Sequence, residues 1–224
     1  MKIFLSSEII WYNLVVRKFS IQMIVIAVII LLGVFALTRG SDTTQEPAQE
    51  SVNKTSQLEN SPKDCSGKAL TPLTEGPYYK ADSPQRQNIT EEGTSGTHLI
   101  LKGYVFNTDC KPVANAWLDF WQADGEGNYD NTGYNLRGHQ YTDEDGFFRL
   151  ETVVPGQYPG RTAHIHFKLR ASETSPAITA QLFFPDSSGN STDSIFDESL
   201  VVEFGTDPDG SKFAAYNIIV PKSE

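Results

Sequence analysis

The sequence is poor in basic residues, cysteine and histidine. Its 224 residues include 18 lysines and arginines against 28 aspartates and glutamates, which gives a formal net charge of −10. This acidic balance argues against a nucleic-acid partner, because binding to phosphates requires clustered basic side chains. With only two cysteines and four histidines, the chain is neither a disulfide-rich scaffold nor a zinc ribbon.

The two cysteines, Cys65 and Cys110, leave two alternatives open. They are either unrelated free thiols or a single disulfide. A location outside the cytoplasm would favour the disulfide, because such bonds persist in oxidising compartments.

A helical period is also missing beyond about Gly67. Short runs rich in branched and aromatic residues, typical of β-strands, occupy residues 97–107, 116–122, 147–154, 162–171, 177–184, 199–204 and 214–220. Turn sequences with Gly, Pro and Asp separate them, as in the stretches DEDG at 143–146 and DPDG at 207–210. Strands at this spacing predict an all-β domain over residues 67–224, an antiparallel β-sandwich of about seven to eight strands.

The N-terminal part is organised differently. Residues 1–20 are expected to form a cytoplasmic segment, since Arg17 and Lys18 flank an apolar run at 21–38. That run is long enough to be a membrane anchor or a signal segment, and the following TRGS is a poor cleavage site, which favours an uncleaved anchor. Residues 39–66 read as a disordered linker. The sequence thus predicts an extracytoplasmic domain, either membrane-anchored or secreted after cleavage.

Two histidines stand close together in a predicted strand. His164 and His166 are separated by one residue, so in a strand both point to the same face. Two imidazoles at this spacing can chelate one metal ion, and neutral imidazole suits iron, copper, zinc and nickel. By itself the pair is equally compatible with two histidines at a polar strand surface.

Two tyrosines near this pair narrow the choice of metal. Tyr158 lies in a Gly/Pro turn six residues before His164, and Tyr129 follows a loop after another predicted strand. A phenol with an ordinary pKa near 10 is a poor ligand for zinc or calcium, whereas a highly charged hard cation stabilises the phenolate. Two tyrosinates and two imidazoles would therefore suit Fe(III), although tyrosines are also common as packing residues in β-domains.

Four stretches of the chain resemble the intradiol ring-cleavage dioxygenases, the family of protocatechuate 3,4-dioxygenase and catechol 1,2-dioxygenase. They are TPLTEGPYY at 71–79, residues 103–130 with the motif WQADGEGNYD, residues 137–167 with PGQYPGRTAHIHF, and ITAQLFF at 178–184. The resemblance implies that Tyr129, Tyr158, His164 and His166 bind Fe(3+). It also implies catalytic roles for Arg161, Gln181 and Tyr158.

The resemblance further implies a reaction. A catechol-type substrate and O2 would react without an external reductant to give cis,cis-muconate-type products. Tyr158 would take up a phenolic proton as a general base, and Arg161 would stabilise charge that builds on the ring. The ring substituents of the substrate and the oligomeric state stay open.

A non-enzymatic reading competes with this one. Residues 103–158 also fit the pattern of transthyretin-like or carboxypeptidase-regulatory-like β-sandwiches, which act as binding or structural modules, and a fold alone does not define a function. Such a module has no reason to keep Arg161, His164, His166 and the Tyr129 loop together. A copper or zinc enzyme built on the two histidines is a third reading, which metal analysis would separate.

Overall fold

A computed structural model describes residues 63–221 of the chain. The apolar segment predicted at 21–38 and nearly all of the linker predicted at 39–66 lie outside these residues. Within the described part, no helix is long and apolar enough to cross a membrane.

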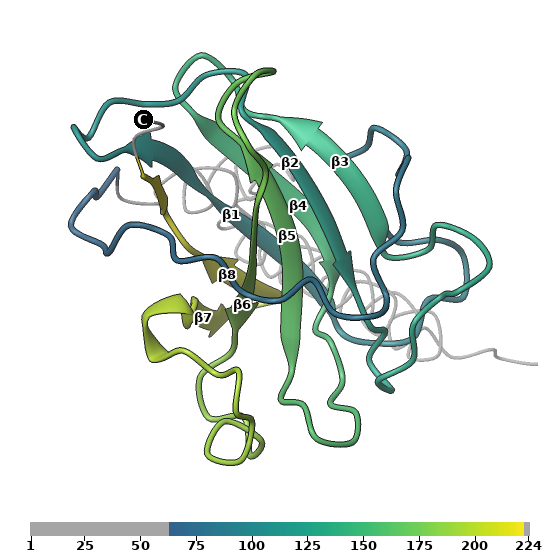
Figure 1. Cartoon of the computed structure of the whole chain (residues 1–224). Helices are drawn as coiled ribbons and strands as arrows, with labels where there is room; N and C mark the ends of the chain where they lie inside the picture. The colour runs from purple at the N-terminus through teal and green to yellow at the C-terminus, as the bar shows by residue number, and fades with distance from the viewer. Residues whose placement is uncertain (1–62, 222–224) are drawn as a thin grey trace, which may run out of the picture. The chain divides into compact units, whose positions relative to one another are not determined.

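The described residues form two packed sheets (Figure 1). The first sheet has four strands in the order β3-β2-β5-β6, and all its neighbours are antiparallel. Its strands are β2 (Trp117–Gln122), β3 (Arg137–Tyr141), β5 (His164–Arg170) and β6 (Ile178–Phe183).

The second sheet has five strands built around the long β1. Its strands are β1 (His98–Asn107), β4 (Phe147–Val153), β7 (Glu203–Thr206), β8 (Lys212–Ala215) and β9 (Ile218–Val220). The β1–β4 and β7–β8 pairs are antiparallel, as predicted, whereas β8 and β9 both pair with β1 in parallel. The predicted all-β sandwich is therefore confirmed, with nine strands among the described residues and two parallel pairings that the sequence did not indicate.

The parallel pairings arise where one predicted strand, 214–220, is divided in two. Tyr216 and Asn217 interrupt it and bond to β1, through Tyr216 N–H to the Lys102 carbonyl (3.1 Å) and Tyr104 N–H to the Asn217 side-chain oxygen (3.0 Å). The chain approaches β1 closely here, since a Cβ on Gly103 would lie 1.9 Å from the Tyr216 carbonyl oxygen. Glycine is thus required where the two segments meet.

Two further elements differ from the sequence prediction. Strand β3 was not predicted, because its sequence RGHQY lacks the branched residues that mark the other strands. The predicted strand at 199–204 is partly a 3₁₀ turn, η1 (Glu198–Leu200), and only its end joins β7. Asp197 starts this turn, because its side chain accepts a hydrogen bond from Ser199 N–H at 2.9 Å.

The core lies between the two sheets. Alternate side chains of β1, β2 and β5 point inward and are fully buried: Leu99, Leu101, Val105, Leu118, Phe120, Ile165, Phe167 and Leu169. Because side chains alternate along a strand, the other residues of β5, His164 and His166 among them, point away from the core to the opposite face of the four-stranded sheet.

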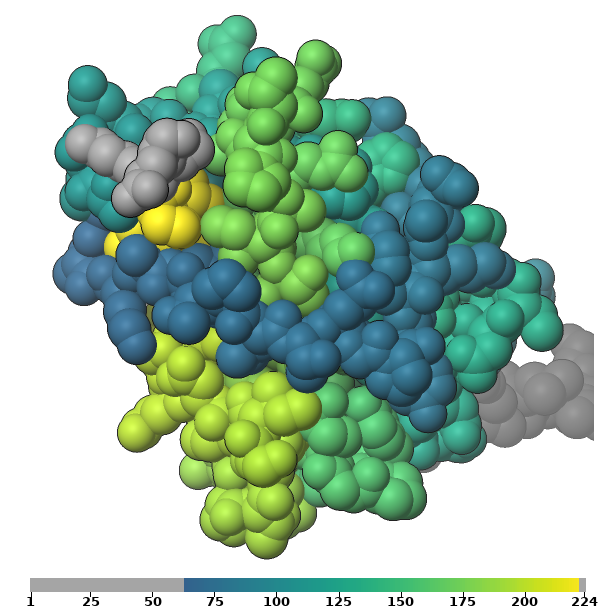
Figure 2. All heavy atoms as spheres, viewed as in Figure 1, coloured from purple at the N-terminus to yellow at the C-terminus, as the bar shows by residue number. Residues whose placement is uncertain are grey.

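A segment before β1, residues 71–86, crosses this opposite face, and we call it the strap. Leu73 N–H bonds to the Thr179 carbonyl on β6 (2.8 Å), while His139 N–H on β3 bonds to the Pro84 carbonyl (3.0 Å). These strands are the two edges of the four-stranded sheet, so the strap spans its width. Figure 2 shows it running across the surface of the molecule.

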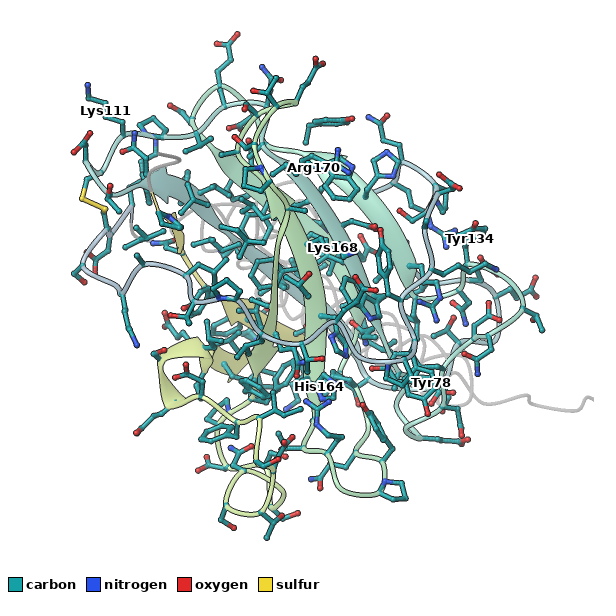
Figure 3. The ribbon with its side chains drawn as sticks, viewed as in Figure 1. Tyr78, Lys111, Tyr134, His164, Lys168 and Arg170 are labelled. Carbon is teal, nitrogen blue, oxygen red and sulfur yellow. A yellow bond between two sulfur atoms is a disulfide. The ribbon has the colours of Figure 1, made fainter. Side chains whose placement is uncertain are left out.

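The two cysteines form a disulfide, which decides between the alternatives that the sequence left open. Cys65 and Cys110 have their Cα atoms 5.6 Å apart. Cys65 precedes the strap, and Cys110 lies in the turn that follows β1. The bond therefore connects the residues just before the strap to the end of β1 in the five-stranded sheet (Figure 3).

Candidate metal centre

Strand register gathers the outer-face side chains of the four-stranded sheet into rows. Trp121 on β2 lies opposite Arg137 on β3 and His166 on β5, and His166 lies opposite Gln181 on β6. Directly opposite residues of antiparallel strands share one face. One cross-strand row thus holds a predicted metal ligand, His166, next to the predicted catalytic Gln181.

The two histidines converge at their Nε2 atoms, which lie 3.0 Å apart in buried surroundings. His164 Nδ1 lies 2.6 Å from the carbonyl oxygen of Thr162. A carbonyl only accepts, so this contact places the proton on Nδ1 and leaves the Nε2 lone pair free to bind a metal. His166 is oriented differently, because its ring stacks on Trp121 with centroids 4.7 Å apart and planes at 9°.

The two predicted tyrosine ligands come from two loops that pack together. Tyr129 lies in the loop after β2, and Tyr158 in the loop between β4 and β5. At Gly127, where φ is +87°, an added Cβ would lie 2.3 Å from the Gln157 carbonyl oxygen. Only glycine combines this backbone conformation with such a close approach, so Gly127 lets the Tyr129 loop lie against the Tyr158 loop.

The phenol rings sit beside the imidazoles. Ring centroids of Tyr129 and Tyr158 are 5.7 Å apart, those of Tyr129 and His166 are 6.4 Å apart, and those of Tyr158 and His164 are 5.7 Å apart. Tyr78 of the strap covers Tyr129, with stacked rings 4.2 Å apart. The structure therefore brings all four predicted ligands into one cluster at one end of the sheet; Figure 3 labels Tyr78 and His164 there.

Burial sets the protonation of these groups in the absence of a metal. It lowers the pKa of His164 to about 4 and that of His166 well below its ordinary value, so both imidazoles are neutral at pH 7. Burial raises the pKa of Tyr129, helped by the nearby Tyr158, and also raises that of Tyr158, which Arg161 opposes. The phenols thus stay protonated unless a cation compensates the phenolate charge.

Arg161 and Gln181 lie next to the cluster, as predicted. Arg161 donates from one terminal nitrogen to the Tyr158 hydroxyl oxygen (3.3 Å) and from the other to the side-chain oxygen of Gln181. Gln181 is fully buried and donates through Nε2 to the Thr74 carbonyl of the strap (3.1 Å). Its amide is engaged at both ends, so a direct contact between Gln181 and a substrate stays a prediction.

Several residues of the site had no role in the sequence analysis. Arg137, which is 2% exposed, donates to the Tyr78 carbonyl (2.6 Å) and twice to the Asp130 carbonyl (3.2 and 2.9 Å). It thereby fastens the strap and the residue after Tyr129 to β3. Arg137 begins one of the stretches that resemble the family, but that stretch was not predicted to form a strand there, and no role was assigned to the arginine. Trp121, Tyr78 and Asp193 were also missed as site residues.

A separate cleft of about 300 Å³ opens at the other end of the same sheet face, lined in part by Trp117, Tyr141 and Arg170. None of the four predicted ligands lines it. It is therefore distinct from the cluster described above.

The donor set fits a hard trivalent cation. Two neutral imidazoles present nitrogen lone pairs, and the Tyr129 hydroxyl oxygen is buried without a hydrogen-bond partner among the described residues. A buried polar atom of this kind calls for an explanation. Two phenolates would supply the negative charge that ferric iron favours, and the ion would in turn reverse the rise in the phenol pKa values.

Comparisons with known proteins agree with the fold and identify the family. The sequence model of the family described as Dioxygenase matches residues 74–218. Hydroxyquinol 1,2-dioxygenase of Rhizobium sp. (strain MTP-10005) is 32% identical over 158 residues, which cover 58% of this chain and 53% of that protein. Catechol 1,2-dioxygenase of Acinetobacter baylyi is 34% identical over 131 residues, covering 45% and 42% of the two chains.

A solved structure extends the likeness. It is the dioxygenase domain of a dioxygenase carbohydrate-binding protein fusion from Streptomyces sp. SirexAA-E, 42% identical, with a TM-score of 0.66. The match covers 70% of this chain and all of that domain. The chain belongs to the intradiol ring-cleavage dioxygenase family, as its motifs predicted. It spans about half the length of the curated relatives that it matches.

Proposed function

We propose that this protein is an intradiol dioxygenase that cleaves a catechol-type ring between its two hydroxyl groups with O2. Ferric iron would be held by Tyr129, Tyr158, His164 and His166. The single observation that carries this proposal is the convergence of the two imidazole Nε2 atoms, 3.0 Å apart, beside two half-buried phenols. A non-catalytic sandwich module explains the two sheets, but it does not explain why these four side chains meet.

The bound ion would supply Lewis acidity, which would make the aromatic ring of the substrate reactive toward O2. The surrounding residues would supply the proton chemistry and the electrostatics. We assign Tyr158 the role of base, because the bound ion would hold it as a phenolate, which can take up a substrate proton, and because Arg161 donates a hydrogen bond to the same oxygen (3.3 Å). Tyr129 is held between Tyr78 and His166, so it would stay in place during the reaction.

Arg161 would serve the second electrostatic role. A guanidinium keeps its charge at every working pH, and that of Arg161 lies beside Tyr158, where substrate would enter. It can therefore stabilise negative charge that develops on the ring.

The cations around the cluster favour a substrate without a carboxylate. Arg137 is bound to two carbonyls, Lys168 is paired with Glu75, and Arg161 is paired with Asp193. A charged ring substituent would have to displace one of these partners. The curated relatives are named for catechol, hydroxyquinol and chlorinated forms of both, none of which carries a carboxylate, and this supports a catechol without a carboxylate as the substrate class.

The proposal is tested by purifying the protein in air, measuring its iron and recording its visible spectrum before and after anaerobic addition of catechol. We expect about one iron per chain, a red-brown colour from tyrosinate-to-iron charge transfer, a shift of that band with catechol, and O2 uptake with a cis,cis-muconate product. A protein that stays colourless and iron-free after ferric or ferrous loading would point to the sandwich module, and bound copper or zinc to the third reading.

We further propose that the domain lies outside the cytoplasm, anchored by the apolar segment or released after its cleavage. The disulfide between Cys65 and Cys110 supports this placement, because cytoplasmic thiols are kept reduced. Protease treatment of intact cells tests it: the domain should be degraded while a cytoplasmic marker survives. Protection of the domain until the cells are lysed would contradict the proposal.

A further inference from the structure

A buried carboxylate outside the predicted site accepts three hydrogen bonds, one of them from the predicted site residue Arg161. Asp193 lies in the loop between β6 and η1, and its side chain is 1% exposed. Its Oδ2 accepts from Arg161 Nε at 2.9 Å and from Thr162 N–H at 3.0 Å, while Oδ1 accepts from Ile195 N–H at 2.9 Å. The carboxylate is therefore fixed by its own loop and in turn fixes the start of β5.

The contact with Arg161 determines where that guanidinium points. Asp193 holds Nε, so the two terminal nitrogens are directed to the Tyr158 hydroxyl and to Gln181. A planar guanidinium with one edge held in this way has a single orientation. Without the carboxylate, the arginine would lose its buried counter-charge and could adopt other rotamers.

The contact with Thr162 acts on the histidine side. Thr162 donates its N–H to Asp193 and offers its carbonyl to His164 Nδ1, at 3.0 and 2.6 Å. Asp193 is thus connected through Thr162 alone to His164, whose tautomer the Thr162 carbonyl sets. Outer groups of this kind commonly orient the residues that bind a metal or substrate.

We propose that Asp193 is a positioning residue that holds Arg161 in the orientation from which it serves Tyr158 and an incoming substrate. This inference rests on the proposed function, since it gives a residue outside the ligand set a positioning role in that reaction. Asp193 acts through Arg161, and it does not itself touch the reacting atoms.

A double-mutant cycle in the full-length, iron-loaded protein tests this. Asp193→Asn keeps the shape but removes the charge, and we expect it to slow the anaerobic catechol-induced change of the visible band, and kcat/KM, by roughly 10- to 100-fold. The band before catechol addition and the iron content should stay close to wild type. In an Arg161→Ala background the same substitution should change the rate by less than about threefold, because residues that act together are not additive.

Asp197→Asn is the matched control. Asp197 lies in the same loop and also accepts a backbone hydrogen bond, from Ser199, but it contacts none of the site residues described above. It should leave the rate unchanged. If Asp193→Asn does not fold, Asp193→Glu replaces it. Glutamate keeps the charge, and its added methylene displaces the guanidinium of Arg161.

An equal loss in both backgrounds, or no loss in the wild-type background, would overturn the positioning role. Wild-type protein that neither binds iron nor responds to catechol would instead refute the proposed function. The two failures are thus distinguished by the behaviour of the wild type alone.

Discussion

The indole of Trp121 lies flat against the imidazole of His166, with ring centroids 4.7 Å apart and planes inclined by 9°. His164 has a hydrogen bond on its Nδ1, whereas His166 Nδ1 is buried without a partner among the described residues. The two neighbouring histidines are therefore held by different forces: one by a carbonyl, the other by an aromatic face from the adjacent strand.

Replacing Trp121 should weaken the metal site. Trp121→Leu removes the stacking surface, and we expect iron affinity to fall by roughly 10- to 100-fold, the range typical of groups that orient metal ligands. Competition with a ferric chelator measures it. Trp117→Leu, on the same strand and face but beside Arg170, should leave the affinity unchanged; an equal loss in both variants would indicate general destabilisation.

The two tyrosines should differ in their phenotypes. Tyr129→Phe is expected to weaken the charge-transfer band, to which only Tyr158 would then contribute, and to lower turnover by roughly 100-fold or more. Tyr158→Phe should retain iron and slow the uptake of catechol, since the base is lost but three ligands remain. Visible spectra and stopped-flow mixing distinguish them. Tyr141→Phe is the control, because Tyr141 is 48% exposed and lines the separate cleft.

The buried histidines should make the metal-free protein sensitive to acid. The pKa of His164 is lowered from 6.5 to about 4, so between these values the unfolded chain binds more protons than the folded one. Stability is therefore full above pH 6.5 and is lost as the pH falls toward 4. Because one pKa unit corresponds to about 1.4 kcal/mol, His164 alone accounts for about 3 kcal/mol of this loss.

Chemical denaturation of chelator-treated protein at several pH values measures the effect. The loss should be smaller in His164→Gln, and smaller in iron-loaded protein, where the metal competes with the proton. Unchanged stability of the metal-free wild type between pH 6.5 and 5 would refute the prediction.

The approach of the two tyrosine loops depends on Gly127. Gly127→Ala would introduce both an unfavourable φ of +87° and a Cβ 2.3 Å from the Gln157 carbonyl oxygen. Gly210→Ala is a close control, because Gly210 has the same φ and open space around it. We expect about 1 kcal/mol of destabilisation for Gly210→Ala and more for Gly127→Ala, with iron lost only in the latter. Denaturation curves and iron content provide the comparison.

The extent of prediction from sequence differs between the parts of the fold. Strands in which branched and aromatic residues recur, such as β1 and β5, were predicted because this pattern lies within one short stretch of the sequence. Strand β3 was missed, because its pairing with β2 and with the strap supplies the stability that its own residues do not indicate. The parallel partners of β1 were missed because a pairing between residues 99–102 and 212–215 leaves no local pattern.

The sequence by itself determined the family and the residues of the candidate site: two histidines with one intervening residue point to one face of a strand, and the motifs around Tyr129 and Tyr158 identify the family. Only the tertiary structure decided how these groups are held. The stack of Trp121 on His166 comes from strand register, and the pairing of Asp193 with Arg161 joins residues that are distant in the chain. Neither is a property of a local pattern, because each depends on which strands and loops pack together once the two sheets have formed.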